Sequence, residues 1–414
     1  MLVAKPESRE IQGPTFIMKT KARTALGRAA IAGAILIAAP AAAQQATGPT
    51  RAWTLAADYK ADVAGVAAGG IDRGARYLDN INIVGDVDLG RAVGWQRAAA
   101  HVSLLNNLGG RPNDLAGSIQ GINNIEVTER HLKVYEAWLE QGIGATVTLK
   151  AGLYDVNSEF YQNDAAGLLV SPMFGVGSEL AATGVNGPAI FPSTALAARL
   201  RVTAGQGYAA IAVVNAHAGT IGDEGGIDLS GRDGALLIGE AGWTGSGRIA
   251  IGAWCYTQDQ PEIVAPGLTP TGDSHASGGV YLLAEHDLLG HADDVRHLTG
   301  FLRLGLSEGR TTPFSGGWQT GLSVEHVFAA RPASAVSIGG GSGFLSRTYR
   351  SGNPAGLPPL GRTETILEAT YSDELVHGVS LQPDVQYVIH PSADPSIADA
   401  LVVGLRLTLS WSSH

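Results

Sequence analysis

The chain has 414 residues, of which 56 are glycine, one is cysteine and 16% are charged. This charged fraction is well below the roughly 25% of ordinary soluble domains, a single cysteine excludes an internal disulfide and a Cys-rich metal site, and a formal net charge of -10 excludes the basic surface that nucleic-acid binding requires. After residue 43 no apolar run reaches the ~18 residues of a membrane-spanning helix, which excludes a helical membrane protein.

The first predicted element is an export signal. Four Lys/Arg residues follow Met18, an apolar stretch covers residues 29–39, and small residues lead up to Ala43. This order is typical of a secretory signal peptide, and the apolar stretch is too short for a membrane anchor. We therefore expect translation to start at Met18, cleavage after Ala43 to remove residues 1–43, and residues 44–414 to form a single domain. Cleavage makes the exported chain more acidic, because the removed residues include six Lys/Arg and two Glu.

The exported chain reads as a series of strands with alternating apolar and polar residues. Between Leu401 and Trp411 every second residue is large and apolar, and most of the residues between them are small or polar. This alternation is typical of a strand with one apolar face. These stretches run about 9 to 13 residues, which matches a tilted transmembrane strand better than the roughly 5 to 6 residues common in soluble sheets. About sixteen strands are predicted, near residues 53–60, 76–89, 95–105, 125–140, 143–155, 194–204, 206–217, 234–244, 248–258, 277–287, 296–307, 317–327, 335–345, 362–372, 379–390 and 399–411.

The predicted connections alternate between short and long. Short turns lie at residues 141–142, 205, 245–247 and 373–378, and long loops lie at residues 61–75, 106–124, 156–193, 259–276 and 346–361. An even number of strands, with every short turn on the side of the termini, is typical of bacterial outer-membrane barrels. In lipid a sheet can pair all its backbone groups only by closing on itself. We therefore predict an all-β fold: a transmembrane antiparallel β-barrel of about 16 strands in the cell outer membrane, with short periplasmic turns, long external loops and membrane lipid around it.

The third external loop, residues 156–193, is the longest connection and contains the apolar run AGLLVSPMFGVG. A barrel of about 16 strands leaves an aqueous channel unless a loop or plug enters it. We expect this loop to fold into the lumen, where it can bury its apolar residues. The alternative is a surface loop that docks on a neighbouring subunit, since long loops without secondary structure are usually functional.

The mature chain resembles the OprB-type carbohydrate-selective porins of Gram-negative outer membranes along nearly its whole length. The resemblance lies in residues 69–89, 119–127, 134–141, 150–160, 174–202 and 379–411, and the block from Gly152 to Leu196 is its most specific part. It implies an outer-membrane porin through which glucose-like mono- and small oligosaccharides diffuse passively into the periplasm, with no chemistry and no cofactor. The chain departs from the usual aromatic end of such proteins, because three residues follow Trp411.

A sugar-selective lumen needs polar side chains for the sugar hydroxyls and aromatic rings for the sugar faces. The polar faces of the predicted strands supply candidates, and Arg199 and Arg201 follow the long loop so closely that we expect them near the constriction. The alternative is that such charges only hydrate the channel or pair across strands. The resemblance adds Asp72, Arg73, Asp155, Asn157 and Glu159, although Asn157 and Glu159 equally suit a role in pinning the loop. The strand candidates are Glu136, Trp138, Glu140, Lys150, Arg199, Arg201, Arg248, Trp254, Tyr256, Arg303, Glu368, Gln382, Asp384, Gln386 and Arg406.

Motifs for chemistry are weak. Residues 286–297 gather histidines and aspartates, but their spacing matches no standard metal site, and adjacent residues such as Asp273, Ser274 and His275 do not make a catalytic triad. We therefore expect no enzyme activity, no metal and no cofactor, and we expect Cys255 to face lipid. A channel for other solutes, a barrel enzyme and a structural barrel remain alternatives, as do a homotrimer and a monomer, and the identity of the sugar stays open.

Overall fold

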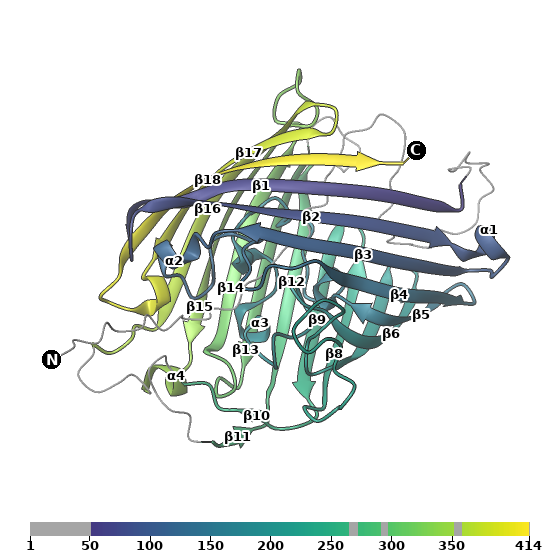
Figure 1. The fold of residues 1–414 in the computed structure, drawn as a ribbon, viewed down its shortest axis with the longest axis horizontal. Helices are drawn as coiled ribbons and strands as arrows, with labels where there is room; N and C mark the ends of the chain where they lie inside the picture. Colours follow the sequence, from purple (N-terminus) through teal and green to yellow (C-terminus); the bar gives the residue numbers. More distant parts are fainter. Residues whose placement is uncertain (1–50, 265–271, 291–296, 352–357, 414) are drawn as a thin grey trace.

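A computed structural model describes residues 51–264, 272–290, 297–351 and 358–413, and within them sixteen antiparallel strands close into one barrel (Figure 1). Neighbours in the chain pair around the ring, and β1 pairs with β18 to close it. The predicted strand number and closure are confirmed, while the predicted signal peptide lies outside the described residues. The barrel strands are β1 (Trp53–Gly70), β2 (Gly74–Asp88), β3 (Ala98–Gly109), β4 (Lys133–Ile143), β5 (Val147–Tyr154), β6 (Ala195–Ala204), β7 (Gly207–Asn215), β8 (Ala235–Thr244), β9 (Gly247–Tyr256), β12 (Gly278–Leu289), β13 (His297–Ser307), β14 (Phe314–Glu325), β15 (Ala335–Leu345), β16 (Thr363–Val376), β17 (Val379–Ile389) and β18 (Ala398–Ser412).

Other regular elements in the described part of the chain are short. Strands β10 (Gln260–Pro261) and β11 (Ser274–His275) form a separate two-stranded sheet. The α-helices are α1 (Leu89–Val93), α2 (Asn113–Ala116), α3 (Ser178–Ala181) and α4 (Arg347–Ser351), and the 3-10 helices are η1 (Val156–Ser158), η2 (Pro172–Phe174) and η3 (Pro391–Ala393).

None of the helices in the described ranges has the length and apolar character needed to cross a membrane.

The connections sort to two ends of the barrel. One end holds the start of β1, the end of β18, helix α1 and tight turns such as residues 205–206 and 377–378; the other end holds α4, β10, β11 and the longer loops (Figure 1). In outer-membrane barrels the end with the short turns faces the periplasm. We number the connections of the opposite, external end in chain order, so that L2 is residues 110–132, L3 is residues 155–194 and L4 is residues 216–234.

Two predicted boundaries near the N-terminus are wrong. The first external connection covers only residues 71–73 rather than 61–75, because β1 continues to Gly70 and pairs there with β18. Small residues such as Ala61, Ala64 and Gly65 occupy both faces of this stretch, so its alternation is faint, and pairing with both neighbouring strands decides its conformation. Strand β4 begins at Lys133 rather than near residue 125, because the preceding residues belong to L2.

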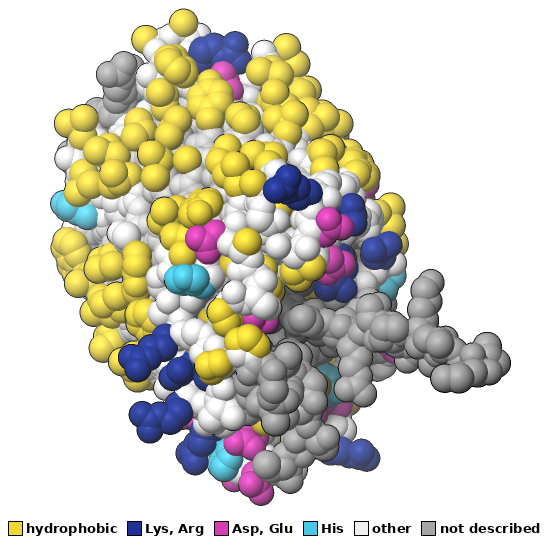
Figure 2. Space-filling model, turned by 90° about the vertical axis from the view of Figure 1, so that its left-hand side faces the viewer, with side chains coloured by type: hydrophobic (Ala, Val, Ile, Leu, Met, Phe, Trp, Pro, Cys, Tyr) yellow, Lys and Arg dark blue, Asp and Glu magenta, His cyan; other side chains and the backbone are white. Residues whose placement is uncertain are grey.

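The outward face of the barrel is apolar. Every one of the sixteen described barrel strands exposes at least one large apolar side chain, for example Leu200, Ile251 and Leu405. Figure 2 shows one face of the molecule, with broad areas of hydrophobic side chains and few charged ones across its upper part. Cys255 also lies exposed on β9, as predicted. An apolar outer wall fits lipid, and it leaves the polar residues of each strand to face inward.

Candidate functional site

L3 folds into the barrel and contacts the wall opposite its own strands. The backbone N–H groups of Val170 and Ser171 donate to the carboxylate of Glu368 on β16 (Ser171 N to Oε2, 2.9 Å). On β13 the fully buried guanidinium of Arg303 donates to backbone carbonyls of L3, including that of Tyr161 (3.3 Å). L3 therefore spans the lumen from β5 and β6 to strands on the far side of the ring, as its apolar sequence predicts.

A glycine run on β15 makes room for the apolar part of L3. A Cβ atom on Gly339 would lie 2.6 Å from Leu169 Cδ1, and one on Gly341 would lie 2.7 Å from Met173 Cε. Both distances are shorter than real Cβ atoms tolerate, so the loop packs directly on bare backbone. The run thus serves close packing of L3 against β15.

L2 also enters the lumen, which sequence reasoning missed. The carboxylate of Glu364 on β16 accepts from Ser118 Oγ (2.7 Å) and from the backbone N–H of Ile119 (2.9 Å). Farther along L2, Asn123 donates to Asp62 of β1 (2.7 Å). The one available signal was the stretch GSIQGINNIEV, whose amides and apolar residues suit burial better than exposure.

Four charged side chains form a group between β4, β5, β6 and the start of L3, which we name the lumen charge cluster (Glu140, Lys150, Glu159 and Arg199). Lys150 Nζ lies 2.5 Å from Glu159 Oε1, and Arg199 bridges Glu140 (2.5 Å) and Glu159 (2.8 Å). Both carboxylate side chains keep 17–18% of their surface exposed. Burial by itself raises the pKa of Glu159, but Lys150 and Arg199 outweigh it and lower that pKa to about 2. Glu159 therefore stays ionised at neutral pH between its two cationic neighbours.

The row of cations continues from the cluster along the same wall. The guanidinium of Arg201 lies 4.3 Å from the ring centroid of Tyr208. Arg248 on β9 pairs with Glu240, donates to Tyr208 Oη (2.7 Å) and donates to the carbonyl of Gln162 in L3 (3.1 Å). Both arginines thus lie inward, as the alternation predicted, and Arg248 also holds L3.

Trp138 does not offer a free ring face. The imidazole of His101 on β3 stacks on its indole with centroids 4.7 Å apart and planes 5° apart, and Lys150 Nζ on β5 lies 4.0 Å from the indole centroid. Strands β3 and β5 flank β4 on opposite sides, so the two neighbours cover both faces of the ring. Trp138 therefore supports the lumen charge cluster rather than providing a stacking platform.

Several predicted candidates are buried under the loops instead of lining open space. Tyr256 binds Thr183 of L3 through its hydroxyl (3.0 Å), Trp254 packs in the same buried group, and Arg406 pairs with Asp62 (2.8 Å). Gln382 and Gln386 donate to carbonyls of L3 and L2. The residues concerned, which anchor loops, are Trp254, Tyr256, Arg303, Glu368, Gln382, Gln386 and Arg406, while Asp384 is buried beside Gln386.

The residues that the resemblance added fall into two groups. Asp155 and Asn157 are buried at the start of L3, where Asp155 accepts from Tyr135 Oη (2.8 Å) and from the backbone N–H of Asn157 (2.9 Å). Glu136 lies beside them and accepts from the N–H of Asp155 (3.2 Å). Arg73 lies exposed in the turn after β1 with Asp72, apart from the cluster. The structure therefore groups Glu159 with the cluster and assigns Asp155 and Asn157 to holding the loop.

Two further segments, residues 286–297 and residues 273–275, were considered above as a metal site and a catalytic triad. Residues 291–296, which include most of the histidine and aspartate segment, lie outside the described residues. His297 Nε2 lies 2.8 Å from Asp287 Oδ1 on the neighbouring strand. Ser274 and His275 form the short strand β11 and pair with β10.

Comparison with known proteins identifies relatives. The family model of the carbohydrate-selective porins, OprB family, matches residues 72–411. The high-pH structure of Pseudomonas putida OprB superposes with a TM-score of 0.76 and 21% identity, covering 87% of this chain and 94% of that one. The low-pH structure of the same protein gives 0.55 at 17% identity (87% and 93% covered), and the channel DcaP of Acinetobacter baumannii gives 0.53 at 10% identity (87% and 97% covered). No curated protein sequence matches.

Proposed function

The chain belongs to the OprB family of carbohydrate-selective porins, and from this premise we propose that its lumen charge cluster is where passing sugars are selected. The protein is an outer-membrane porin for carbohydrates, and its family is one of channels rather than enzymes. We further propose that glucose-like mono- and small oligosaccharides diffuse passively through this barrel, without catalysis.

The observation that carries the proposal is a compact group of charged donors and acceptors whose two carboxylates keep 17–18% of their surface exposed beside the two loops that enter the barrel. Lys150 and Arg199 are 9% and 3% exposed and direct their N–H donors at the acceptor oxygens of Glu140 and Glu159. A sugar hydroxyl donates and accepts hydrogen bonds at once, so it can exchange contacts with both kinds of group as it passes. Because the four charges cancel, the cluster has little net attraction for ions, and this favours neutral polar solutes.

Sugar selection in this proposal rests on hydrogen bonds more than on ring stacking. Both faces of Trp138 are covered, and Trp254 and Tyr256 are buried. Arg201 and Arg248 extend the donor row along the wall next to the cluster. L2 and L3 narrow the lumen, so solutes pass close to these groups. Among the predicted pore-lining residues we therefore propose Glu140, Lys150, Glu159, Arg199, Arg201 and Arg248 as the sugar-contacting set.

Reconstitution tests the function directly. The purified protein should conduct ions in planar lipid bilayers, and liposomes that contain it should swell faster in glucose than in a neutral amino acid of similar mass. Addition of sugar should reduce the ion current, because a sugar held at the cluster obstructs the pore. Absence of both conductance and swelling would contradict a channel, and equal swelling rates in the two solutes would replace carbohydrate selectivity with a general pore.

The surroundings of the barrel follow from its outer wall. Since all sixteen described barrel strands expose large apolar side chains, lipid can contact the whole circumference. Of the two assembly states that the sequence left open, a monomer and a homotrimer, we propose the monomer, in which lipid surrounds the whole barrel. We also propose that the chain is exported and that residues 1–43 are removed as a signal peptide.

A further inference from the structure

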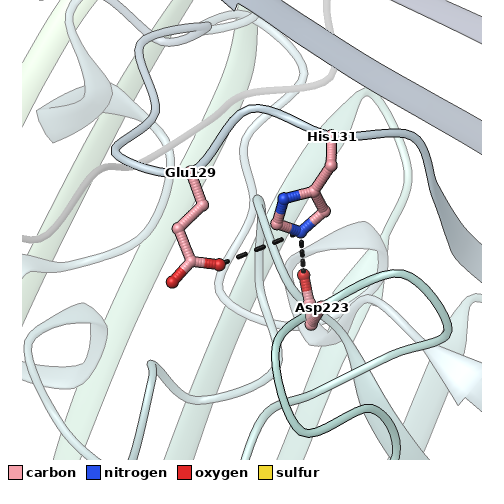
Figure 3. A group of neighbouring side chains, drawn as sticks. All are labelled: Glu129, His131 and Asp223. Atoms are coloured by element: carbon pink, nitrogen blue, oxygen red, sulfur yellow. Dashed lines mark hydrogen bonds and ion pairs between the residues drawn. The ribbon is translucent and has the colours of Figure 1, made fainter.

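We propose that L2 and L4 share a binding site for a divalent transition-metal ion, formed by Glu129, His131 and Asp223 (Figure 3). Glu129 and His131 lie at the end of L2, just before β4 begins at Lys133, and Asp223 lies in L4. The site is therefore at the external mouth of the barrel, away from the lumen charge cluster, and the inference stands independently of sugar selection.

The ligand atoms already converge. His131 Nε2 lies 3.8 Å from Glu129 Oε2 and 3.4 Å from Asp223 Oδ1, and one ligand atom from each of the three residues lies within 4.8 Å of the others. Figure 3 shows the imidazole between the two carboxylates, with the same nitrogen directed at both. Metal–ligand bonds of about 2.1 Å in a tetrahedral site place ligand atoms about 3.4 Å apart. Only small side-chain rotations would bring all three to that spacing.

The least exposed ligand is held in place by the backbone. Asp223 has a side chain that is 3% exposed, and its Oδ2 accepts from the N–H of Thr220 (3.0 Å). The Thr220 hydroxyl donates to the carbonyl of Val134 at the start of β4, and the N–H of Val134 donates to the carbonyl of Ile221 (2.9 Å). L4 is thus fastened to the strand that follows His131, which places its carboxylate before any ion binds.

The other two ligands give the site its access to solvent. The side chains of Glu129 and His131 are 56% and 32% exposed. An ion from the external medium can therefore reach the imidazole nitrogen without rearrangement of the barrel, and water can complete its coordination. One imidazole and two carboxylates suit Zn²⁺ and similar borderline ions better than Mg²⁺ or Ca²⁺, which prefer oxygen ligands throughout.

Lys133 is the competitor for this ion. Its ammonium pairs with Asp223 Oδ1 and has a second acceptor in Ser193 Oγ (3.2 Å). Asp223 Oδ1 therefore already holds a cationic group at the position where the metal ion would bind. A dication would displace or share the contact with Lys133, and removal of the ammonium should therefore strengthen metal binding.

A second group, His217, Asp228 and Asp233, provides a matched control because it lies entirely within L4. His217 Nδ1 is 3.0 Å from Asp233 Oδ2, while the carboxylate of Asp228 accepts from the N–H of Ser230 (3.0 Å). It offers the same ligand types but does not join two loops.

Titration of the detergent-solubilised, untagged mature protein with ZnCl₂ in a calorimeter tests the site. We expect one Zn²⁺ per chain, a loss of affinity of at least tenfold in His131→Ala, unchanged affinity in His217→Ala and tighter binding in Lys133→Gln. Glu129→Gln, at an exposed position, should also weaken binding and provides a second variant that leaves the fold intact. Absence of saturable binding, binding that survives His131→Ala, or binding that is lost in His217→Ala would overturn the proposal.

Discussion

At the scale of single residues, the lumen charge cluster shows how pairing decides what a charged side chain can do. Arg199 is 3% exposed and bridges two carboxylates, whereas Arg406 is 2% exposed and ties β18 to β1 through Asp62. Both arginines occupy inward positions in the two-residue alternation of their strands, so the sequence pattern alone gives them the same role. Their difference lies in their partners: Arg406 binds Asn124 of L2 and the buried Asp62, whereas Arg199 binds Glu140 and Glu159, whose carboxylates stay 17–18% exposed.

Replacement of Arg199 and Arg201 by alanine should weaken sugar block of the ion current by about five- to thirtyfold, because one or two hydrogen bonds of roughly 1 kcal/mol each are lost. The double variant should also become more cation-selective, since two positive charges leave the wall. Single-channel recordings with increasing glucose measure both effects. Arg73→Ala, in the exposed turn after β1, is the matched control and should behave like the parent; unchanged block in the double variant would remove both arginines from the constriction.

At the scale of elements, L3 crosses the lumen and is bound to the barrel wall on both sides. Near its start Glu159 pairs with Lys150 and Arg199, and across the lumen Glu368 and Arg303 bind its backbone. Its apolar residues pack on the bare glycines of β15. Because these contacts join distant strands, L3 also braces the barrel.

Acid should loosen the near side of L3 through Glu159. A carboxyl with a folded-state pKa lowered to about 2 stabilises the fold at pH values above its ordinary pKa near 4.5, and this contribution is lost as the pH falls toward 2. Planar-bilayer recordings should therefore show increasingly frequent current fluctuations between pH 4.5 and pH 2.5. Glu159→Gln should show such fluctuations already at neutral pH, whereas Glu224→Gln, at an exposed position in L4, should not; a quiet Glu159→Gln channel would disprove the role of this ion pair.

Alternation in the sequence predicted which strand residues face inward, but it could not predict the path of L2. The alternation on β4, β5 and β6 placed Glu140, Lys150 and Arg199 on the inner wall. It held no information on L2, whose Ser118 binds Glu364 over a separation of 246 residues. Loops that turn inward are stabilised by contacts with distant strands, and such contacts leave no periodic pattern in the loop itself.

At the scale of the whole molecule, the low charged fraction follows from a barrel whose outer face contacts lipid and whose inner face contacts water and the inserted loops. The outer face cannot carry many charges because lipid does not solvate them, and the inner face holds most of the buried ion pairs. Closure between β1 and β18 leaves no unpaired sheet edge within the described barrel.

The exported chain should begin at Gln44 and remain a monomer. Native mass spectrometry of protein purified from outer membranes in detergent measures both quantities, since the chain mass reports the cleavage position and the complex mass reports the copy number. A chain mass that includes residues before Gln44 would refute the predicted cleavage, and a threefold complex mass would replace the monomer with the homotrimer.

By itself the sequence determined the barrel, its strand number and the inward set of charged residues, because a two-residue alternation and the need to pair every backbone group in lipid leave little other choice. Only the tertiary structure decided which of those residues remain accessible. Trp138 is covered by His101 and Lys150, Arg303 is sealed under L3, and the carboxylate of Asp223 meets His131 across two loops. Accessibility and convergence depend on segments that approach one another in space while lying far apart in the chain, and local patterns carry no record of that approach.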